Sequence, residues 1–382
     1  MTPAARAQAA ITILDRILAG DPAEAALLRW SRASRFAGSG DRAAVRDMVF
    51  DSLRCRNSRA ALGGALTGRG LILGMCRDEG LDPDSVFSGE GHAPARLNAD
   101  ERAAGRQPTD VERLDLPDWL LPPWTAALGP QAEAVALAMR ERAPVWLRAN
   151  ALRATPQQAA KALADEGIET APSSDLATAL RVTSGARRLS ASRAYRDGLV
   201  ELQDLSPQLA CAMLPRAASV LDYCAGGGGK SLAVAAAGGV EVTAHDANPA
   251  RMADLAERAR RAGARIRIAQ PGQIRGKFDL VLTDVPCSGS GTWRRTPDAK
   301  WRLDRSDLDR LVALQARIMD EAARLVVPGG HLAYMTCSVL AEENDRQVAA
   351  FSESSGFVQV TRRLLVSPQG SDGFFVAILK AC

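Results

Sequence analysis

The sequence predicts an α/β fold in which a mostly parallel sheet is covered by helices on both faces. The main observation is that apolar strands and helices alternate from residue 219 onward, as in doubly wound sheets. The second is the length, because 382 residues exceed one ordinary domain and suggest two or three. We expect a helical domain over residues 1–128, a small α+β module over 129–214 and the sheet domain over 215–382.

The N-terminal part is expected to consist of helices. Apolar residues recur at helical spacing over residues 4–67, and Asp41 is expected to cap the third of these helices. Residues 80–112 are rich in Gly, Pro, Asp and Arg and are predicted to form a loop. Prolines between residues 117 and 123 mark a boundary before another helix near 129–142.

Strands and helices follow in mixed order. For the small module, the pattern predicts a strand at 145–150, a helix at 156–165 and short strands near residues 180 and 200. For the sheet domain, the expected strands are SVLDYC, VEVTAHD, IRIA, FDLVLTD and HLAYMT, with two more near 357 and 374–379. A long helix at about 305–326 precedes HLAYMT.

The charge composition excludes a highly basic protein that coats nucleic acid. The formal net charge is only +4, yet 43 of the 48 basic residues are arginine, and the first 60 residues carry ten arginines against six acids. Arginine suits bidentate phosphate contacts and stacking on bases. A GC-rich genome, which encodes arginine by default, is an equally good explanation.

Cysteine usage indicates a reducing compartment. The seven cysteines form an odd set without a CxxC pair, which argues against a disulfide framework or a zinc site, and no metal is expected. No apolar run approaches 18 residues, and Asp15 and Arg16 interrupt the N-terminal apolar stretch. We therefore expect a cytoplasmic protein without a membrane span or signal peptide.

A glycine-rich turn joins the first strand of the sheet domain to a helix. The segment SVLDYCAGGGGKS contains Gly226 to Gly229, which let a ligand approach backbone N–H groups closely. A P-loop needs glycine where Cys224 stands, and a dinucleotide fingerprint needs glycine or alanine where Ser231 stands. An S-adenosylmethionine loop tolerates this pattern, and Asp246 at the next strand end can accept the ribose hydroxyls. The alternative is a plain tight turn that caps the helix.

Two cysteines follow two further strand ends. Asp284 is the last residue of FDLVLTD and Cys287 follows it by three positions, and Cys337 comes just after HLAYMT. If these strands are neighbours, about 4.8 Å apart, both thiols lie at one cleft beyond their carboxyl ends. A thiolate that adds to carbon 6 of cytosine activates carbon 5 towards a methyl sulfonium, and a carboxyl group at Asp284 can hydrogen-bond the base. The alternative, a cysteine that only fills space, is kept for the other five, namely Cys55, Cys76, Cys211, Cys224 and Cys382.

At these residues the chain resembles the Sun/Nop2 family of RNA cytosine carbon-5 methyltransferases. The stretches that carry the resemblance are LDYCAGGGGKS, DVPCSGSGTWRRTPDAKW, YMTCSVLAEEN and DGFFVAIL, within residues 145–382. The arginine-rich helical part is similar, more weakly, to the antiterminator-like RNA-binding domain of the bacterial small-subunit rRNA members. The resemblance implies a class I (Rossmann-like) S-adenosylmethionine methyltransferase domain.

The resemblance also implies roles for individual residues. Cys337 would be the nucleophile, Cys287 would assist product release, and Asp284 and Lys230 would stand near the reacting base. The implied cofactor-binding residues are Cys224, Ala225, Gly226, Gly227, Gly228, Gly229, Lys230, Asp246, Gln270 and Asp284. Two features depart from the family pattern. Gly226 and Gly227 replace alanine and proline, which predicts weaker cofactor binding because flexible glycines lose more entropy, and Gln270 replaces an acid near the adenine.

Two other segments are weaker candidates. Trp293, Arg294, Arg295, Lys300, Trp301 and Arg302 form a basic and aromatic stretch. It either binds phosphates and stacks a base or is a solvated loop with packed tryptophans. Glu343 and Asn344 are expected either to cap a helix or to brace the turn at Cys337, and we favour bracing. His92, His245 and His331 lack ligand spacing and are expected to be structural.

The expected function is transfer of a methyl group from S-adenosylmethionine to carbon 5 of a cytosine in RNA, with 16S rRNA as the expected substrate. The enzyme is expected to act as a monomer. One alternative is a DNA cytosine carbon-5 methyltransferase, in which Cys287 would be the nucleophile. A tRNA cytosine methyltransferase and an inactive RNA-binding assembly factor are the others.

Overall fold

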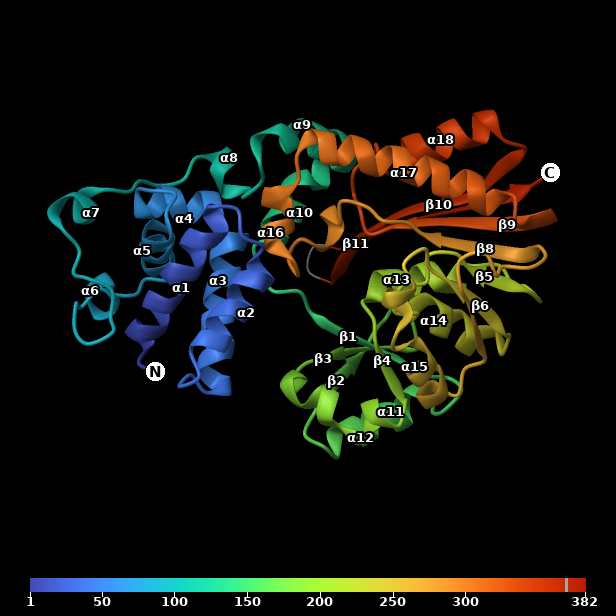
Figure 1. The fold of residues 1–382 in the computed structure, drawn as a ribbon, viewed down its shortest axis with the longest axis horizontal. Coiled ribbons are helices and arrows are strands. Elements are labelled where there is room, and N and C mark those ends of the chain that lie inside the picture. Colours follow the sequence, from blue (N-terminus) through green and yellow to red (C-terminus); the bar gives the residue numbers. More distant parts are fainter. Residues whose placement is uncertain (368–369) are drawn as a thin grey trace. The chain divides into compact units, whose positions relative to one another are not determined.

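The computed structural model describes residues 1–367 and 370–382 and forms two compact units (Figure 1). One unit contains residues 1–142 and 293–303, and the other contains residues 143–292 and 304–382. The segment 293–303 thus belongs to the first unit although the sequence on both sides of it belongs to the second, which we did not predict. The boundaries expected near residues 128 and 214 remain predictions.

The first unit is helical. Its main helices are α1 (Pro3–Leu18), α2 (Ala23–Ala33), α3 (Ser39–Arg54), α4 (Arg56–Gly63) and α5 (Gly68–Asp78). Apolar side chains such as Leu14, Val49 and Leu71 form its core. The prediction that Asp41 caps α3 is wrong, because α3 begins at Ser39 and Asp41 lies in its first turn. There the carboxylate accepts the Gly38 N–H and pairs with Arg6 and with the N-terminal amine.

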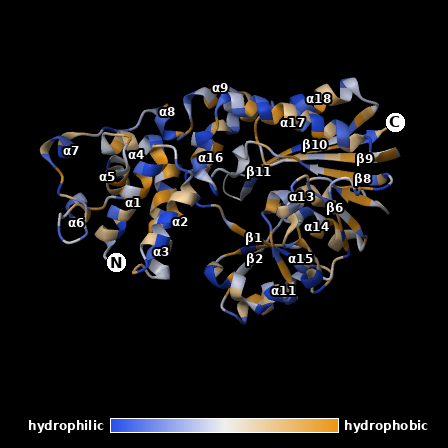
Figure 2. Ribbon diagram, viewed as in Figure 1, coloured by the Kyte–Doolittle hydropathy of each residue, from blue (hydrophilic) through white to orange (hydrophobic). Residues whose placement is uncertain are grey.

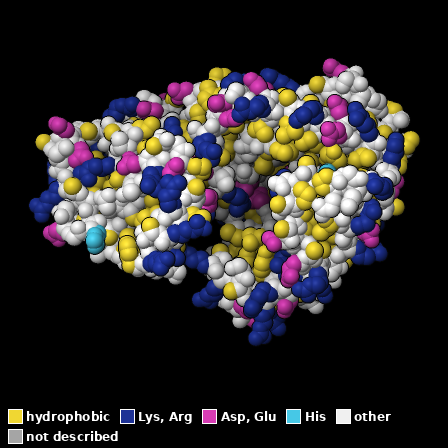
Figure 3. Space-filling model, in the orientation of Figure 1, with side chains coloured by type: hydrophobic (Ala, Val, Ile, Leu, Met, Phe, Trp, Pro, Cys, Tyr) yellow, Lys and Arg dark blue, Asp and Glu magenta, His cyan; other side chains and the backbone are white. Residues whose placement is uncertain are grey.

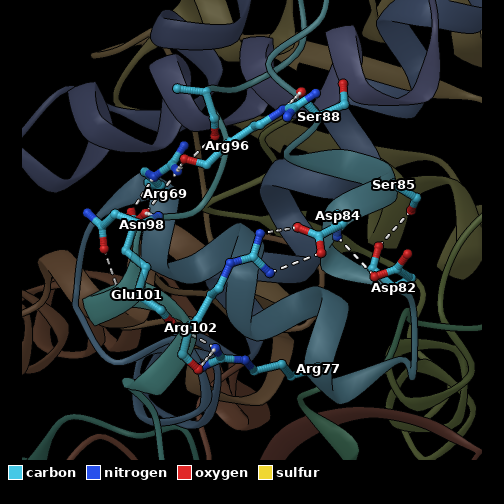
Figure 4. A network of polar contacts seen from close by, with 11 residues as sticks. Arg69, Arg77, Asp82, Asp84, Ser85, Ser88, Arg96, Asn98, Glu101 and Arg102 are labelled. Atoms are coloured by element: carbon cyan, nitrogen blue, oxygen red, sulfur yellow. Dashed lines mark hydrogen bonds and ion pairs between the residues drawn. The ribbon is translucent and has the colours of Figure 1, made fainter.

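The segment predicted as a loop over residues 80–112 contains short helices. These helices are α6 (Pro83–Val86), α7 (Ala99–Ala103) and α8 (Asp110–Arg113). The other short helices of this unit are η1 (Asp118–Leu120), α9 (Leu121–Leu128), η2 (Gly129–Gln131), α10 (Ala132–Ala138) and α16 (Pro297–Arg302). Arginines hold the segment in place (Figure 4): Arg69 pairs with Glu101, and Arg102 pairs with Asp84. Arg77 donates to the carbonyl oxygens of Leu62 and Ala104.

The second unit starts with the small module. It contains β1 (Val145–Ala149), α11 (Pro156–Ala164), β2 (Thr170–Pro172), β3 (Ala179–Val182), η3 (Ala186–Ala191), α12 (Arg193–Arg196) and β4 (Val200–Leu202). The four strands pair in the order β2-β3-β1-β4, and each pair is antiparallel. The buried amide of Asn150 donates to Gly198 O and to Ala262 O, both at 2.8 Å. The module is thereby attached to the sheet domain by buried polar contacts.

The sheet domain is doubly wound, as predicted. Its elements are α13 (Leu205–Ala212), β5 (Val220–Asp222), α14 (Gly229–Gly238), β6 (Val242–His245), η4 (Pro249–Met252), α15 (Leu255–Ala262), β7 (Ile266–Ala269), β8 (Phe278–Asp284), η5 (Ser290–Thr292), α17 (Arg305–Ala323), β9 (Val326–Thr336), α18 (Asp345–Ser354), β10 (Phe357–Ser367) and β11 (Ser371–Ala381). The strand order is β10-β11-β9-β8-β5-β6-β7, with β10 and β11 antiparallel to their neighbours. α17 and α18 cover one face, and α13, α14 and α15 cover the other (Figure 1). The order reverses between β5 and β8, and such a switch point is where ligands bind in these sheets.

Apolar residues gather in the central strands of this sheet (Figure 2). Within the described residues, no helix is both long and apolar enough to cross a bilayer. On the face drawn in Figure 3, acidic and basic side chains are interspersed over both units, in keeping with the net charge of +4.

Candidate active site

The glycine turn lies between β5 and α14. Gly226 and Gly228 have φ values of +50° and +80°, a left-handed backbone that favours glycine. A Cβ atom on Gly228 would also collide with Leu255, so this position requires glycine for two reasons. The Gly226 N–H donates to Asp246 Oδ2 at 3.0 Å, which connects the turn to the end of β6. The predicted glycine loop and the predicted carboxylate are therefore in direct contact.

A pocket of about 280 Å³ opens beside this turn. Its lining residues are Leu202, Gln203, Pro207, Asp222, Cys224, Ala225, Gly226, Gly227, Gly229, Lys230, Arg251, Arg258 and Asp284. Asp222 is buried, and burial raises its pKa to about 6, although a hydrogen bond from Ser231 at 2.6 Å acts in the opposite direction. Its Oδ1 atom has no hydrogen-bond partner within the described residues. A buried acceptor on the wall of a pocket is available to a polar ligand.

The structure places the remaining cofactor candidates differently. Asp246 is buried, and its Oδ2 atom also accepts from Arg251 at 3.2 Å. Gln270 follows β7, is exposed, and does not line the described pocket. Arg251, Arg258 and Asp222 line the pocket but were not predicted.

Arg258 holds the turn from α15. It donates to the Gly227 carbonyl oxygen and to Glu201 Oε2, the latter at 2.9 Å. Glu201 is a buried residue of β4 that also pairs with Arg261. The glycine turn is thereby connected through one guanidinium group to the small module.

Lys230 and Asp284 form an ion pair between α14 and the end of β8. The Lys230 Nζ atom lies 2.6 Å from Asp284 Oδ2 and 5.0 Å from the centroid of the Phe374 ring. Burial disfavours the ammonium group, but the Asp284 carboxylate outweighs burial and raises the pKa of Lys230. Lys230 is therefore a fixed positive charge beside the pocket.

Cys287 and Cys337 meet at the carboxyl ends of two adjacent parallel strands. β8 and β9 pair with Asp284 opposite Met335, and the two Sγ atoms lie 3.3 Å apart. The hydrogen bond from Cys287 lowers the pKa of Cys337, and its reciprocal effect raises the pKa of Cys287. Both side chains are half-buried. The two thiols that were predicted to lie together are adjacent in the structure, but neither of them lines the described pocket.

The other five cysteines are free and differ from this pair. Burial raises the pKa of the thiols of Cys76 and Cys211 to about 11. It also raises the pKa of Cys224, so that this residue lines the pocket as a protonated thiol. Cys382 is exposed, so the expectation of a space-filling role is wrong for that residue.

Glu343 and Asn344 brace the two cysteine loops, as expected. The buried Glu343 carboxylate accepts the Ser288 N–H at 2.8 Å and the Ser338 hydroxyl at 2.5 Å. Asn344 accepts from Thr336 at 2.6 Å and donates to Ser338 O at 2.9 Å. Ser288 and Ser338, which directly follow the two cysteines, are therefore both hydrogen-bonded to the segment of Glu343 and Asn344.

The hypothesis that residues 293–302 bind RNA is wrong for three of them, whereas Arg295 and Arg302 are exposed. Trp293, Arg294 and Lys300 are buried in the helical unit, where Trp293 stacks on Trp124. The Lys300 ammonium group donates to Arg54 O at 3.1 Å, and the Trp301 indole donates to Leu53 O at 2.7 Å. These side chains fasten α16 to α3, and the alternating basic and aromatic pattern reflects packing.

Comparisons with known proteins agree with this architecture. The family model described as 16S rRNA methyltransferase RsmB/F matches residues 211–372, and an RsmF/B-like ferredoxin-like domain model matches residues 116–187. A ribosomal RNA small subunit methyltransferase B from Xanthomonas campestris pv. campestris is 33% identical over 311 residues, which cover 74% of this chain and 71% of that protein. The protein of the same name from Citrobacter koseri is 34% identical over 290 residues and covers 71% and 68%.

The chain belongs to the RsmB/F family of 16S rRNA methyltransferases.

Solved structures support the fold of this RsmB/F protein. A methyltransferase homologue from Pyrococcus horikoshii superposes with a TM-score of 0.60 at 21% identity, covering 72% of this chain and 98% of that one. NSun6 from the same organism, solved with SFG, gives a TM-score of 0.61 at 16% identity, covering 69% and 98%. The predicted resemblance and the Rossmann-like methyltransferase fold are confirmed.

The pocket fits S-adenosylmethionine, the methyl donor of this methyltransferase family. The left-handed glycine turn leaves space for a ligand, and the free Oδ1 of Asp222 is a buried acceptor for the amino group of an amino acid. When bound, this cofactor supplies an electrophilic methyl group on a sulfonium ion. Lys230 and Asp284 stand where the pocket meets the cysteine loops.

Proposed function

We propose that this RsmB/F protein methylates carbon 5 of a cytosine in small-subunit ribosomal RNA, through a covalent adduct with Cys337. The observation that carries the proposal is the pair of sulfur atoms 3.3 Å apart, formed by strands that meet beside the glycine turn. Addition to the base requires only one nucleophile, so the second thiol is available to assist another step. Two thiols at one point suit a reaction in which a covalent bond to the base is first made and later broken.

Cys337 performs the addition. Its thiolate forms a bond to carbon 6, and the electron pair of the carbon 5–carbon 6 double bond moves to carbon 5, so that carbon 5 becomes the nucleophile in methyl transfer. The hydrogen bond from Cys287 lowers the pKa of Cys337, which increases the thiolate fraction near neutral pH. Asp284, held by Lys230, is placed to accept a hydrogen bond from the exocyclic amine and so orient the base, and the Lys230 ammonium group supplies the positive charge that opposes negative charge on the ring.

Cys287 assists release. After methyl transfer a water molecule takes the proton from carbon 5, and the C–H electron pair re-forms the double bond between carbon 5 and carbon 6. The bond between carbon 6 and sulfur breaks in the same step, and its electron pair returns to Cys337 as a thiolate. The S–H group of Cys287 stabilises that departing thiolate through the same hydrogen bond that favoured it before attack. Without this donor, expulsion slows and the adduct persists.

The cofactor would be held by the turn from Cys224 to Lys230, with Asp222, Asp246 and Arg251 around it. The helical unit and the small module would bind the RNA, and the enzyme would act as a monomer in the bacterial cytoplasm. Because the target base must leave its stack, the substrate is an unpaired or partly assembled region of the RNA.

Serine substitution of each cysteine tests the assignment of roles. Cys337→Ser should abolish methyl transfer to RNA, and Cys287→Ser should accumulate a covalent protein–RNA complex that survives denaturing electrophoresis. Cys382→Ser, an exposed thiol outside the pocket, is the matched control and should behave as the parent protein. An active Cys337→Ser variant would overturn the assignment, and a requirement for Cys287 alone would favour the DNA-methyltransferase type of nucleophile.

A further inference from the structure

The Glu343 carboxylate differs from Asp284 and Asp246 in how its charge is balanced. Asp284 is paired with Lys230, and Asp246 is paired with Arg251. Within the described residues no cation pairs with Glu343, although its side chain is fully buried. The negative charge of Glu343 is therefore not neutralised by a neighbouring positive group.

Four hydrogen-bond donors surround this carboxylate. Gln315 Nε2 and Ser288 N donate to Oε1 at 2.9 and 2.8 Å, and the hydroxyls of Ser288 and Ser338 donate to Oε2, both at 2.5 Å. All four are neutral groups, so they stabilise the charge without cancelling it. An ionised carboxylate in a low-dielectric interior acts strongly on titratable groups nearby.

The charged groups around the two thiols are arranged asymmetrically. Glu343 and Cys337 both raise the pKa of Cys287, the hydrogen bond to Cys337 being the larger cause. On Cys337 the hydrogen bond from Cys287 has the largest effect, and Asp284 and Lys230 act with opposite signs. Tyr334 on β9 also faces this site and is uncharged, because burial raises its pKa. Glu343 contacts the Cys287 loop through both the N–H and the hydroxyl of Ser288, and the Cys337 loop through the Ser338 hydroxyl alone.

We propose that Glu343 selects the nucleophile: its charge, bound to the Cys287 loop through Ser288, keeps the proton on Cys287 and leaves the thiolate on Cys337. Two sulfur atoms 3.3 Å apart share one proton after the first ionisation, and the local field decides which of them carries it. Glu343 is thus a positioning residue that acts through the cysteines and does not touch the base. The inference rests on the proposed roles of the two cysteines.

Alkylation of the protein alone tests this selection. Iodoacetamide would be reacted with the full chain over a pH series, and modification of Cys337 and Cys287 would be quantified separately by mass spectrometry. In the parent protein Cys337 should react first. In Glu343→Gln, which keeps the shape but removes the charge, the preference for Cys337 over Cys287 should fall about tenfold, one pKa unit. An unchanged preference in a folded variant would overturn the proposal.

Ser288→Ala is the matched control, because it removes one hydroxyl donor and keeps both the charge and the backbone contact. If it shifts the preference as much as Glu343→Gln, loop geometry and not charge decides, and the proposal fails. If Glu343→Gln does not fold, the single-cysteine variants Cys337→Ser and Cys287→Ser still provide a test. The remaining Cys287 thiol should titrate above the remaining Cys337 thiol, and the reverse order would refute the proposal. No RNA or methyl donor is present, so failure here leaves the proposed methyl transfer untouched.

Discussion

At the residue scale, reactivity at this site depends on how each charge is paired. Asp284 is held by Lys230 at 2.6 Å, so its orientation towards the pocket is fixed by an ion pair between two different elements. The two thiols are fixed by their strands and by the buried Glu343 segment. The side chains that would touch the base therefore do not depend on mobile loops for their orientation.

Asp284→Asn should reduce single-turnover methyl transfer by about 100-fold, the size of effect seen when one electrostatic stabiliser is removed from an active site. The amide cannot form an ion pair with Lys230, so both the acceptor that orients the base and the position of the Lys230 ammonium group are lost. Asp279→Asn is the control, because Asp279 lies on the same strand at its opposite end and only binds Ser219. Equal losses in the two variants would contradict the role given to Asp284.

Most residues with proposed chemical roles could be predicted from the sequence, whereas the residues that hold them in position could not. Cys287, Cys337 and Asp284 stand out because each follows an apolar strand in a turn of small residues. Arg251 and Arg258 were missed, because nothing in a helix sequence shows which arginine faces a loop thirty residues earlier. The stretch at Trp293 was left with two interpretations for the same reason, since a buried cation beside tryptophan has the same sequence pattern as an exposed one.

At the scale of elements, the glycine turn has a restraint that offsets its four glycines. Gly226 and Gly227 were predicted to weaken cofactor binding, because flexible residues lose more entropy on ordering. In the structure Arg258 from α15 donates to the Gly227 carbonyl oxygen and is itself held by Glu201. The restraint that a proline would supply covalently is supplied here by a neighbouring helix.

Arg258→Met should therefore weaken S-adenosylmethionine binding about tenfold, the effect expected for loss of a charge-assisted hydrogen bond. Gly227→Pro should strengthen binding about threefold, because proline reduces the conformational entropy that the turn loses when it is ordered. In the double variant with Arg258→Met, the same substitution should restore part of the lost affinity. Calorimetric titration measures all three. Arg260→Met, an exposed position on the same helix, is the control. An affinity of Arg258→Met equal to that of the control would contradict the restraint.

The type of each helix or strand and its place along the chain were easier to predict than the way the elements pair in space. Each predicted strand of the sheet domain is present, because period and length separate strands from helices. The order β10-β11-β9-β8-β5-β6-β7 was not predicted in detail, because pairing depends on contacts between distant segments. The short helices of residues 83–113 were missed because they are held by arginine contacts to carbonyl oxygens and not by their own periodicity.

At the scale of the whole molecule, each unit carries its own buried polar interactions. In the helical unit, burial lowers the pKa of Lys300 to about 8, with Asp115 acting in the opposite direction. Lysine has a pKa of about 10.4 when unfolded, so between these values the unfolded chain binds one proton more than the folded chain. Stability from this group is present at high pH and is lost as the pH falls through 8.

Lys300→Met should accordingly be more stable than the parent protein at pH 7, and the difference should shrink by about 2 kcal/mol as the pH rises from 8 to 10. Five of the six tryptophans, all except Trp146, lie in the helical unit, so guanidinium denaturation followed by tryptophan fluorescence reports on this unit. Lys277→Met, an exposed lysine, is the control. A difference that does not change with pH would contradict the buried, titrating lysine.

The most direct test of the account is to identify the sulfur atom that bonds to the base. A fragment of small-subunit ribosomal RNA containing 5-fluorocytidine would be incubated with the protein and S-adenosylmethionine, because fluorine at carbon 5 blocks the final elimination and traps the adduct. Mass spectrometry of the digested complex should find the nucleotide attached to the peptide containing Cys337. Attachment to Cys287, or a methylated RNA without any trapped adduct, would contradict the account.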